Sequence, residues 1–95
     1  MLSQRIRELR LAFGWSQVEL ASRLRISKQT VSNWENDNIQ PSIEMLIRLA
    51  KTFGVTTDYL VGLDDVLRLD IAGLPTEFVA HLELLIADYR KLQTP

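Results

Sequence analysis

Apolar side chains recur every three or four residues through most of the first 62 positions, the period of helices with one buried face. Residues that cap or break helices divide this stretch into five short helices. We expect them from about Ser3 to Phe13, from Ser16 to Leu24, at about residues 28–36, from Ser42 to Gly54, and after Thr56 or Thr57. Their expected core contains Leu2, Ile6, Leu9, Phe13, Leu20, Ala21, Leu24, Val31, Trp34, Ile43, Leu46, Leu49, Ala50, Phe53, Tyr59 and Leu60.

The pattern changes after Gly62. Residues 67–72 alternate apolar and polar side chains, which predicts a short strand, and Gly73 ends it. A last helix is expected to open at Thr76, just after Pro75. Its apolar residues follow a 4-3-4-3 spacing that suits pairing with a second helix, and we call them the seam: Phe78, Leu82, Leu85, Tyr89 and Leu92.

Two interpretations of this last helix stay open. The favoured one is dimerisation through the seam, in which residues 66–71 of two subunits could also form a two-stranded ribbon. The other is that the helix folds back on its own domain, since two heptads are a short repeat. The chain thus divides into a domain at residues 1–62 and an acidic linker with a C-terminal helix at residues 63–95.

Composition narrows the class of protein. The 95 residues suit one small domain with an appendage, and there is no cysteine for disulfides or thiolate sites. The N-terminus is charged and unlike a signal peptide, and no apolar stretch is long enough to span a membrane, so a cytoplasmic protein is expected. Nucleophile–base pairs, metal-ligand spacings and glycine-rich phosphate loops are missing, so we expect neither an enzyme nor a cofactor. The single histidine, His81, has no companion ligand.

Charge is distributed unevenly along the chain. Residues 1–62 carry eight Lys or Arg against six Asp or Glu, whereas residues 63–95 carry three against six. The excess of acid therefore lies outside the first domain. A net charge of −1 for the whole chain means that binding to phosphates would depend on a few well-placed cations and helix N-termini.

The second and third expected helices hold the most informative residues. Ser16 and Glu19 have the spacing of a capping box, and Ser27 can cap the third helix. In that third helix Val31 and Trp34 face inward, and the opposite side holds what we call the polar stripe: Gln29, Ser32, Asn33 and Asn36. Amides and hydroxyls suit the donor and acceptor groups of base edges, so this pattern indicates a helix-turn-helix with its recognition helix at about residues 28–36.

Residues 2–62 resemble the phage-repressor/Cro-type (Xre-like) helix-turn-helix family. The agreement rests on Gln17, Glu19-Leu20-Ala21, Ile26-Ser27, Val31-Ser32, Trp34-Glu35, Pro41-Ser42, Leu49-Ala50, Phe53-Gly54-Val55 and the run from Asp58 to Gly62. The resemblance implies an all-α, five-helix lambda-repressor-like DNA-binding domain, here followed by a short strand-like linker and the C-terminal dimerisation helix. Arg25 and Asp37 stand where many members have glycine, and both positions are expected to need a positive φ.

Placement in this motif assigns the site residues. The expected DNA-binding set is Gln17, Ser27, Lys28, Gln29, Thr30, Ser32, Asn33 and Asn38. By resemblance, Gln17 bonds a phosphate and braces the start of the recognition helix. Gln29 is the first choice for a base contact, because its amide matches adenine, and Lys28 could reach a guanine or a phosphate. For each of these residues the alternative is an ordinary surface side chain. The resemblance also implies a structural salt bridge between Arg10 and Glu35.

The combined prediction is a sequence-specific regulator of transcription that binds double-stranded DNA. We expect a bacterial or phage repressor that binds a pseudo-palindromic operator as a homodimer. The alternative is an antitoxin-like module, in which the acidic tail binds a protein partner while the first 62 residues still contact DNA.

Overall fold

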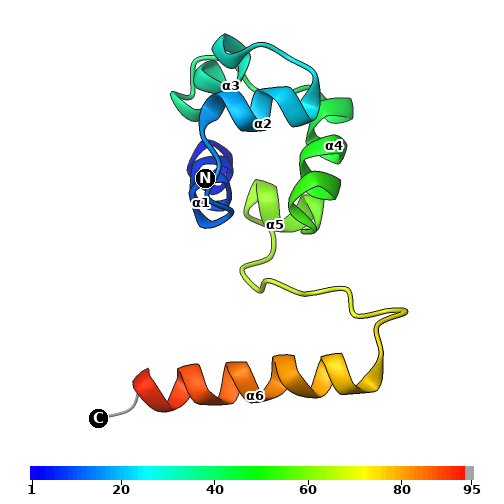
Figure 1. Cartoon of the computed structure of the whole chain (residues 1–95). Coiled ribbons are helices and arrows are strands. Elements are labelled where there is room, and N and C mark those ends of the chain that lie inside the picture. Colours follow the sequence, from blue (N-terminus) through cyan, green and yellow to red (C-terminus); the bar gives the residue numbers. More distant parts are fainter. Residues whose placement is uncertain (94–95) are drawn as a thin grey trace.

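The computed structural model describes residues 1–93, in which six helices are joined by turns and loops. Their bounds are Leu2–Ala12 (α1), Gln17–Leu24 (α2), Lys28–Glu35 (α3), Ile43–Phe53 (α4), Thr57–Val61 (α5) and Thr76–Gln93 (α6). Figure 1 shows α1 to α5 gathered in one body, with α6 set apart from it at the end of an extended linker. The predicted C-terminal region also includes residues 94–95, which lie outside the described residues.

A single core joins all five helices of the first domain. Each helix contributes at least one side chain that is almost fully excluded from solvent: Ile6, Leu20, Leu24, Val31, Leu49 and Leu60. Leu9, Ala21, Trp34, Ala50 and Phe53 complete the buried cluster. Burial of these apolar groups supplies most of the driving force for folding, because helices of this length are not stable alone in water. The predicted all-α, five-helix domain is confirmed.

Side-chain caps begin the helices at the predicted residues. Ser16 accepts a bond from the Glu19 backbone, and the Glu19 carboxylate accepts one in return, so the capping box is confirmed. Ser27, Ser42 and Thr56 also accept bonds at the starts of their helices. Arg25, at the end of α2, has a φ of 57°, the left-handed conformation predicted at this glycine-like position.

Two residues expected in the core are exposed instead. Phe13 follows the last residue of α1 and is 45% exposed; its ring packs against Trp15 and Phe53, with centroids 4.8 and 5.4 Å away. Ile43 is 80% exposed because it is the first residue of α4, where its side chain lies beyond the neighbouring helices. Helical periodicity places a residue on a face, but it does not show where the packed part of that face ends.

The short strand predicted within residues 67–72 is wrong: no strand occurs in the part of the chain that the structure describes. A strand needs a neighbouring strand to pair its backbone groups, and this linker has none beside it. The alternation has a different cause. Leu67, Leu69 and Ile71 line a groove together with α6 residues Val79, Leu82 and Ile86, so alternate side chains of an extended linker face the last helix.

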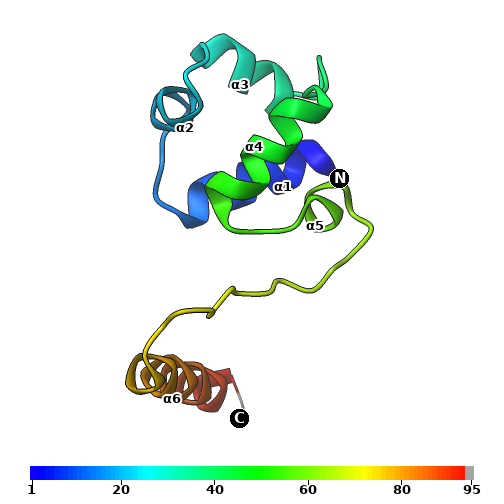
Figure 2. The ribbon, with the colours of Figure 1, turned by 90° about the vertical axis from the view of Figure 1, so that its right-hand side faces the viewer.

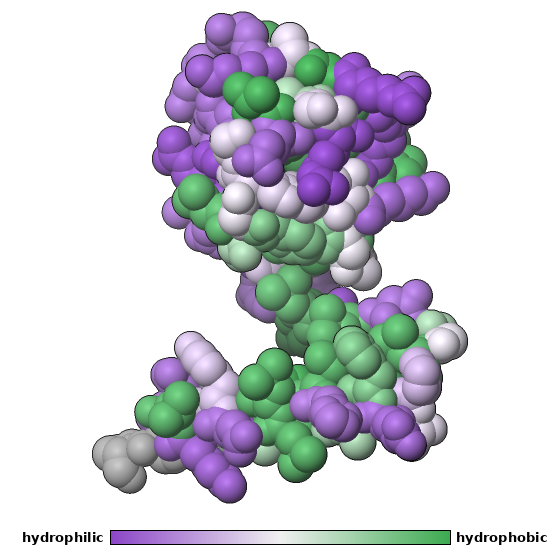
Figure 3. All heavy atoms as spheres, viewed as in Figure 1, coloured by the Kyte–Doolittle hydropathy of each residue, from purple (hydrophilic) through white to green (hydrophobic). Residues whose placement is uncertain are grey.

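The seam of α6 is open to solvent. None of the described residues of α6 is buried, and four of the five seam residues are at least half exposed: Phe78, Leu85, Tyr89 and Leu92. Figures 1 and 2 show α6 on the far side of the linker from α1 to α5, and Figure 3 shows hydrophobic residues gathered over the linker and α6. Within residues 1–93 no helix combines the length and hydrophobicity needed to cross a bilayer.

Candidate nucleic-acid interface

Helix α3 presents a polar face at the edge of the domain. Its inner residues Val31 and Trp34 are 0% and 3% exposed and belong to the core. On the other side Lys28 and Gln29 are exposed, and Ser32 and Asn33 are partly exposed. Figure 1 shows α3 at the end of the domain opposite α6, so neither α6 nor the linker covers this face.

Side-chain hydrogen bonds join the residues of the polar stripe in two pairs. The Gln29 amide nitrogen donates to the Asn33 side-chain oxygen at 3.0 Å, and the Asn36 amide nitrogen donates to the Ser32 hydroxyl at 3.2 Å. Both pairs are four residues apart and therefore lie one turn apart on the same face. Gln29 keeps a second N–H and its carbonyl oxygen, the donor and acceptor that match adenine in the major groove.

The first turn of α3 is fixed by its own hydroxyls. The Ser27 hydroxyl accepts a bond from the Thr30 backbone at 3.1 Å and lies 2.8 Å from the Thr30 hydroxyl. These two predicted site residues therefore hold the helix start, whereas the exposed Lys28 between them carries the positive charge. A cation beside the N-terminus of a helix adds its positive charge to the unpaired backbone N–H groups there, so this position favours a phosphate or a guanine edge.

The turn after α3 holds the remaining predicted residue. Asp37 has a φ of 58°, so the second glycine-like position is also left-handed, and its carboxylate accepts a bond from the Gln40 amide at 2.7 Å. The next residue, Asn38, is exposed, and its backbone donates to the Asn33 carbonyl at 2.9 Å. The side chain of Asn38 thus extends from a defined turn at the C-terminal end of the polar stripe.

A buried ion pair ties α3 to α1. Arg10 donates to both oxygens of the Glu35 carboxylate at 2.7 and 2.9 Å, and the Glu35 side chain is completely buried. Arg10 also donates to the backbone oxygen of Trp15 at 2.8 Å. A bidentate pair with this burial fixes orientation as well as distance. The arrangement has the geometry expected for the predicted salt bridge between Arg10 and Glu35.

Gln17 joins the same network. Its amide nitrogen donates to Glu35, the last residue of the expected recognition helix, at 3.2 Å, so Gln17 braces the end of this helix. The resemblance implied that Gln17 braces the start of the helix instead. Gln17 is partly exposed and retains its carbonyl oxygen and a second N–H for a contact outside the protein. The structure brings Gln17, Arg10 and Glu35 together, and the hydrogen bond of the Gln17 side chain goes to Glu35.

The Glu35 carboxylate is ionised in this setting. Burial alone would raise its pKa, but hydrogen bonds from Arg10 and Gln17 and the positive charges of Arg10 and Arg7 outweigh burial and hold the pKa below its ordinary value. The same hydrogen bond to Glu35 raises the pKa of Arg10 against the opposing effect of burial. The pair therefore stays charged at neutral pH and remains a fixed link between the two helices.

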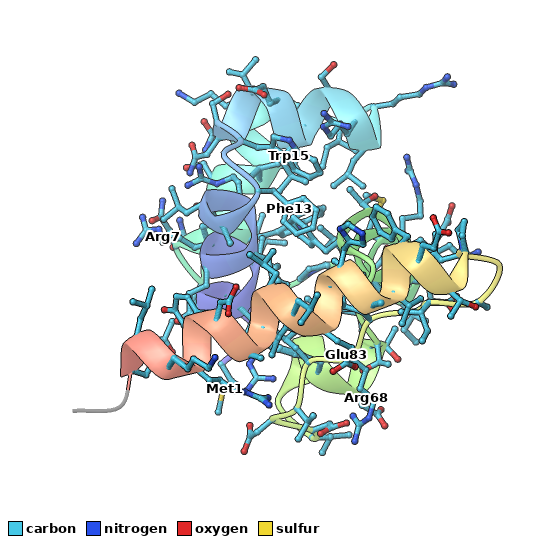
Figure 4. The ribbon with its side chains drawn as sticks, turned by 60° about the horizontal axis from the view of Figure 1, so that its bottom comes forward. Met1, Arg7, Phe13, Trp15, Arg68 and Glu83 are labelled. Carbon is cyan, nitrogen blue, oxygen red and sulfur yellow. The ribbon has the colours of Figure 1, made fainter. Side chains whose placement is uncertain are left out.

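Sequence reasoning missed the second arginine of this network. Arg7 lies with its Nε 3.6 Å from Glu35, and its spacing of three residues from Arg10 could have revealed it. It also missed an aromatic cluster on another side of α1, where Arg23 lies 4.0 Å from the Trp15 ring centre. Figure 4 shows Phe13 and Trp15 together there, and Arg7 on the other side of the helix.

The described residues contain no group of three His, Cys, Asp or Glu side chains placed to hold a metal ion. His81 is exposed on α6. The site is an exposed helix face that carries amide and hydroxyl groups, with a lysine at the start of the helix. The opposite side of the helix is fixed to the rest of the domain. This arrangement suits recognition of a nucleic-acid groove.

Comparison with known proteins points the same way. The family model described as "Helix-turn-helix" matches residues 6–60. The HTH-type transcriptional regulator ImmR of Bacillus subtilis is 38% identical over 65 residues, which cover 68% of this chain and 51% of ImmR. The HTH-type transcriptional activator BcrR of Enterococcus faecalis is 30% identical over 67 residues, covering 70% of this chain and 33% of BcrR. The chain thus spans about half the length of ImmR and a third of BcrR.

Solved structures share the fold over nearly the whole chain. A transcriptional regulator from Listeria innocua has a TM-score of 0.63 and 23% identity, with 100% of this chain and 97% of that chain covered. A chain of the SinR protein/SinI protein complex has a TM-score of 0.60 and 24% identity, with 98% and 97% covered. Both likenesses extend beyond the first five helices, so a helical domain followed by a C-terminal helical segment is a recurring architecture.

Proposed function

The chain belongs to the phage-repressor/Cro-type helix-turn-helix family, and on that premise we propose that it is a sequence-specific DNA-binding regulator that acts as a homodimer. One observation carries this proposal. After Lys28, the exposed side of α3 carries uncharged side chains that can form hydrogen bonds. The other side of α3 packs in the core, and Glu35 links the helix to α1. Such a helix can enter a major groove without changing its own shape.

Specificity and affinity would come from different residues. Gln29, supported by its bond to Asn33, would read a base edge in each half-site. Lys28 would pair with a phosphate or a guanine at the helix start. Gln17, next to Glu35, and Asn38, in the turn after α3, would contact the phosphate backbone and set the register of the domain on the duplex.

The exposed seam of α6 supports the homodimer. Phe78, Leu85, Tyr89 and Leu92 form a connected apolar surface that a second copy of α6 would cover. Two-fold symmetry would then place two copies of α3 in successive major grooves, about 34 Å apart. The matching operator is pseudo-palindromic. Where it overlaps a promoter, the bound dimer would exclude polymerase, which is the basis for proposing a repressor.

Selection of bound fragments from a random DNA pool tests the recognition step. We expect a two-fold symmetric consensus, and Gln29→Ala should relax the preference at one position in each half-site. If Lys28 contacts a phosphate, Lys28→Ala should instead weaken all sequences alike and reduce the salt dependence by about one unit per subunit. A pool that shows no enrichment, or binding that is insensitive to salt, would contradict the proposal.

Two further measurements test the dimer and the sign of regulation. Light scattering should give a dimer for the full chain and a monomer for a version that ends at Gly62. A reporter placed behind the selected operator should be silenced by the full chain. Since the relative BcrR is named an activator, increased expression is a definite alternative result that would refute the repressor role.

A second candidate is supported by the same apolar surface. The seam could bind a different protein, as in an antitoxin-like module, while α3 still binds DNA. A monomeric full chain that forms a complex of defined stoichiometry with the product of an adjacent gene would favour this function over the homodimer. A stable dimer that retains its mass in the presence of that product would exclude it.

A further inference from the structure

The linker is anchored to the first domain by one arginine of α1. Arg5 donates to the backbone oxygens of Tyr59 and Asp64, the latter at 2.8 Å, and to the Asp65 carboxylate at 2.7 Å. Its guanidinium carbon lies 3.9 Å from the centre of the Tyr59 ring. We call these contacts the Arg5 clamp. The Arg5 side chain is only 12% exposed, so the clamp is partly shielded from water.

Local bonds extend this anchoring along the linker. Gly62 turns the chain with a φ of 86°, and the next two backbone amides both donate to the Asp58 carbonyl, at 2.9 and 3.3 Å. The Asp64 carboxylate accepts a bond from the Val66 backbone at 3.0 Å and pairs with Arg68. These bonds fix the first residues of the linker, from Gly62 to Arg68, next to α5.

The other end of the linker lies beside the proposed dimer helix, with its apolar side chains still 47–71% exposed. Leu67, Leu69 and Ile71 line a groove with Val79 and Leu82 of α6. Figures 1 and 2 show α6 set apart from the domain at the end of this linker. Arg5 thus holds the start of the linker against the domain, and Leu67, Leu69 and Ile71 further along lie beside α6.

Helix α1 holds both the recognition helix and the linker. Arg10 holds the recognition helix through Glu35, and Arg5, less than two turns earlier, holds the linker that leads to α6. We propose that Arg5 is a positioning residue that sets which half-site spacing the dimer prefers. This inference rests on the proposed function, because spacing has meaning only for a dimer that binds two half-sites. In a rigid dimer the second half-site is bound strongly at one spacing and poorly at others.

A spacing series with the full chain tests this role. Two consensus half-sites would be separated by about 8 to 14 base pairs in single steps, and affinity measured for each duplex. The wild-type protein should favour its best spacing over its neighbours by about tenfold, and Arg5→Ala should reduce this ratio to about threefold or less. Arg5→Lys keeps the charge but loses the forked donors, so it should flatten the profile in the same way.

Two variants separate positioning from lost stability. Arg48→Ala removes another part-buried arginine that donates to a backbone oxygen, that of Leu24, so it should cost stability but leave the spacing profile unchanged. Asp65→Ala removes only the exposed partner of the clamp and should flatten the profile by less than Arg5→Ala. If Arg5→Ala does not fold, the spacing profile of Asp65→Ala tests the proposal in its place. An unchanged spacing profile for Asp65→Ala would overturn the proposal.

The remaining outcomes are also decisive. Folded, dimeric Arg5→Ala and Arg5→Lys proteins with the wild-type profile would show that Arg5 does not set spacing, while the proposed function would stand. A wild-type protein that is monomeric by light scattering and indifferent to spacing would overturn the proposed function itself, and this inference with it. Uniform weakening at all spacings would mean that Arg5 acts through general electrostatics and would refute the positioning role.

Discussion

Removal of the Glu35 side chain should destabilise the domain before it alters sequence preference. The carboxylate is fully buried and bonded to Arg10 and Gln17, so Glu35→Ala leaves the Arg10 guanidinium without its counter-charge. Loss of one partner of a buried ion pair costs about 3–5 kcal/mol. We expect about 3 kcal/mol, the lower end, because Arg10 keeps its bond to the Trp15 backbone and is 8% exposed.

The expected effect is large for a domain of this size. At 4–8 °C of melting temperature for each kcal/mol, about 3 kcal/mol corresponds to a fall of about 12–24 °C. Urea unfolding followed by the fluorescence of the two tryptophans, Trp15 and the buried Trp34, gives the free energy of unfolding. Protein concentration must be the same throughout, since dimerisation would add to the apparent stability. Operator selection at a temperature where the variant is folded should return the wild-type consensus.

Glu8→Ala is the matched control, because Glu8 is a carboxylate on α1 that is exposed to solvent. It should change the free energy of unfolding by less than about 0.5 kcal/mol. The double variant Arg10→Ala/Glu35→Ala should be less destabilised than the sum of its single variants, since it leaves no unpaired buried charge. An unchanged melting temperature for Glu35→Ala, or strictly additive single variants, would refute the structural role assigned to the pair.

Three further perturbations have outcomes that follow from the same geometry. Because the pKa of Glu35 is lowered in the folded state, its contribution to stability is complete above its unfolded pKa of about 4.3 and is lost as the pH falls through the folded value. The stability gap between wild type and Glu35→Gln should thus be constant near neutrality and shrink below about pH 4, whereas a gap that widens in acid would contradict the assignment. Arg25→Gly should raise the free energy of unfolding by about 0.5–1 kcal/mol in urea titrations, since glycine adopts a φ of 57° without strain, and Arg25→Lys should give no gain. Gln29→Ala/Asn33→Ala should stay within about 0.5 kcal/mol of wild type because it alters only side chains that are at least partly exposed, and a larger loss in calorimetry would mean that the polar stripe supports the fold.

The five-helix domain could be predicted from sequence because its signals are local. Ser16, Ser27 and Ser42 mark helix starts through bonds to residues three positions ahead, and each cap is present. Periodicity identified Val31 and Trp34 as buried for the same reason, since both lie on one face of one helix. Such features depend on neighbours in the chain and need no knowledge of how the helices pack.

The errors occurred where the outcome depends on distant parts of the chain. The alternation at Leu67, Leu69 and Ile71 is real, but a strand also requires a paired partner, and these residues line a groove beside α6 instead. The Arg5 clamp joins residues more than fifty positions apart, so no local pattern could reveal it. For the candidate site, helical spacing predicted that the residues of the polar stripe share one face of α3, and they do. The bond from Gln17 to Glu35 could not be predicted, because it depends on how α2 packs against α3.

The short recognition helix shows why anchoring and reading can be separated in this domain. Eight residues rich in Gln, Thr, Ser and Asn would not form a stable helix alone, so α3 depends on the burial of Val31 and Trp34 and on its tie through Glu35. These anchoring groups lie on the face turned away from the polar stripe. If Gln29 and Asn33 contact bases, as proposed above, substitutions there should change which bases are recognised without weakening the fold. Because the same anchors hold the helix before DNA arrives, little ordering is required when it enters the groove, and the binding energy of each amide contact is retained as affinity.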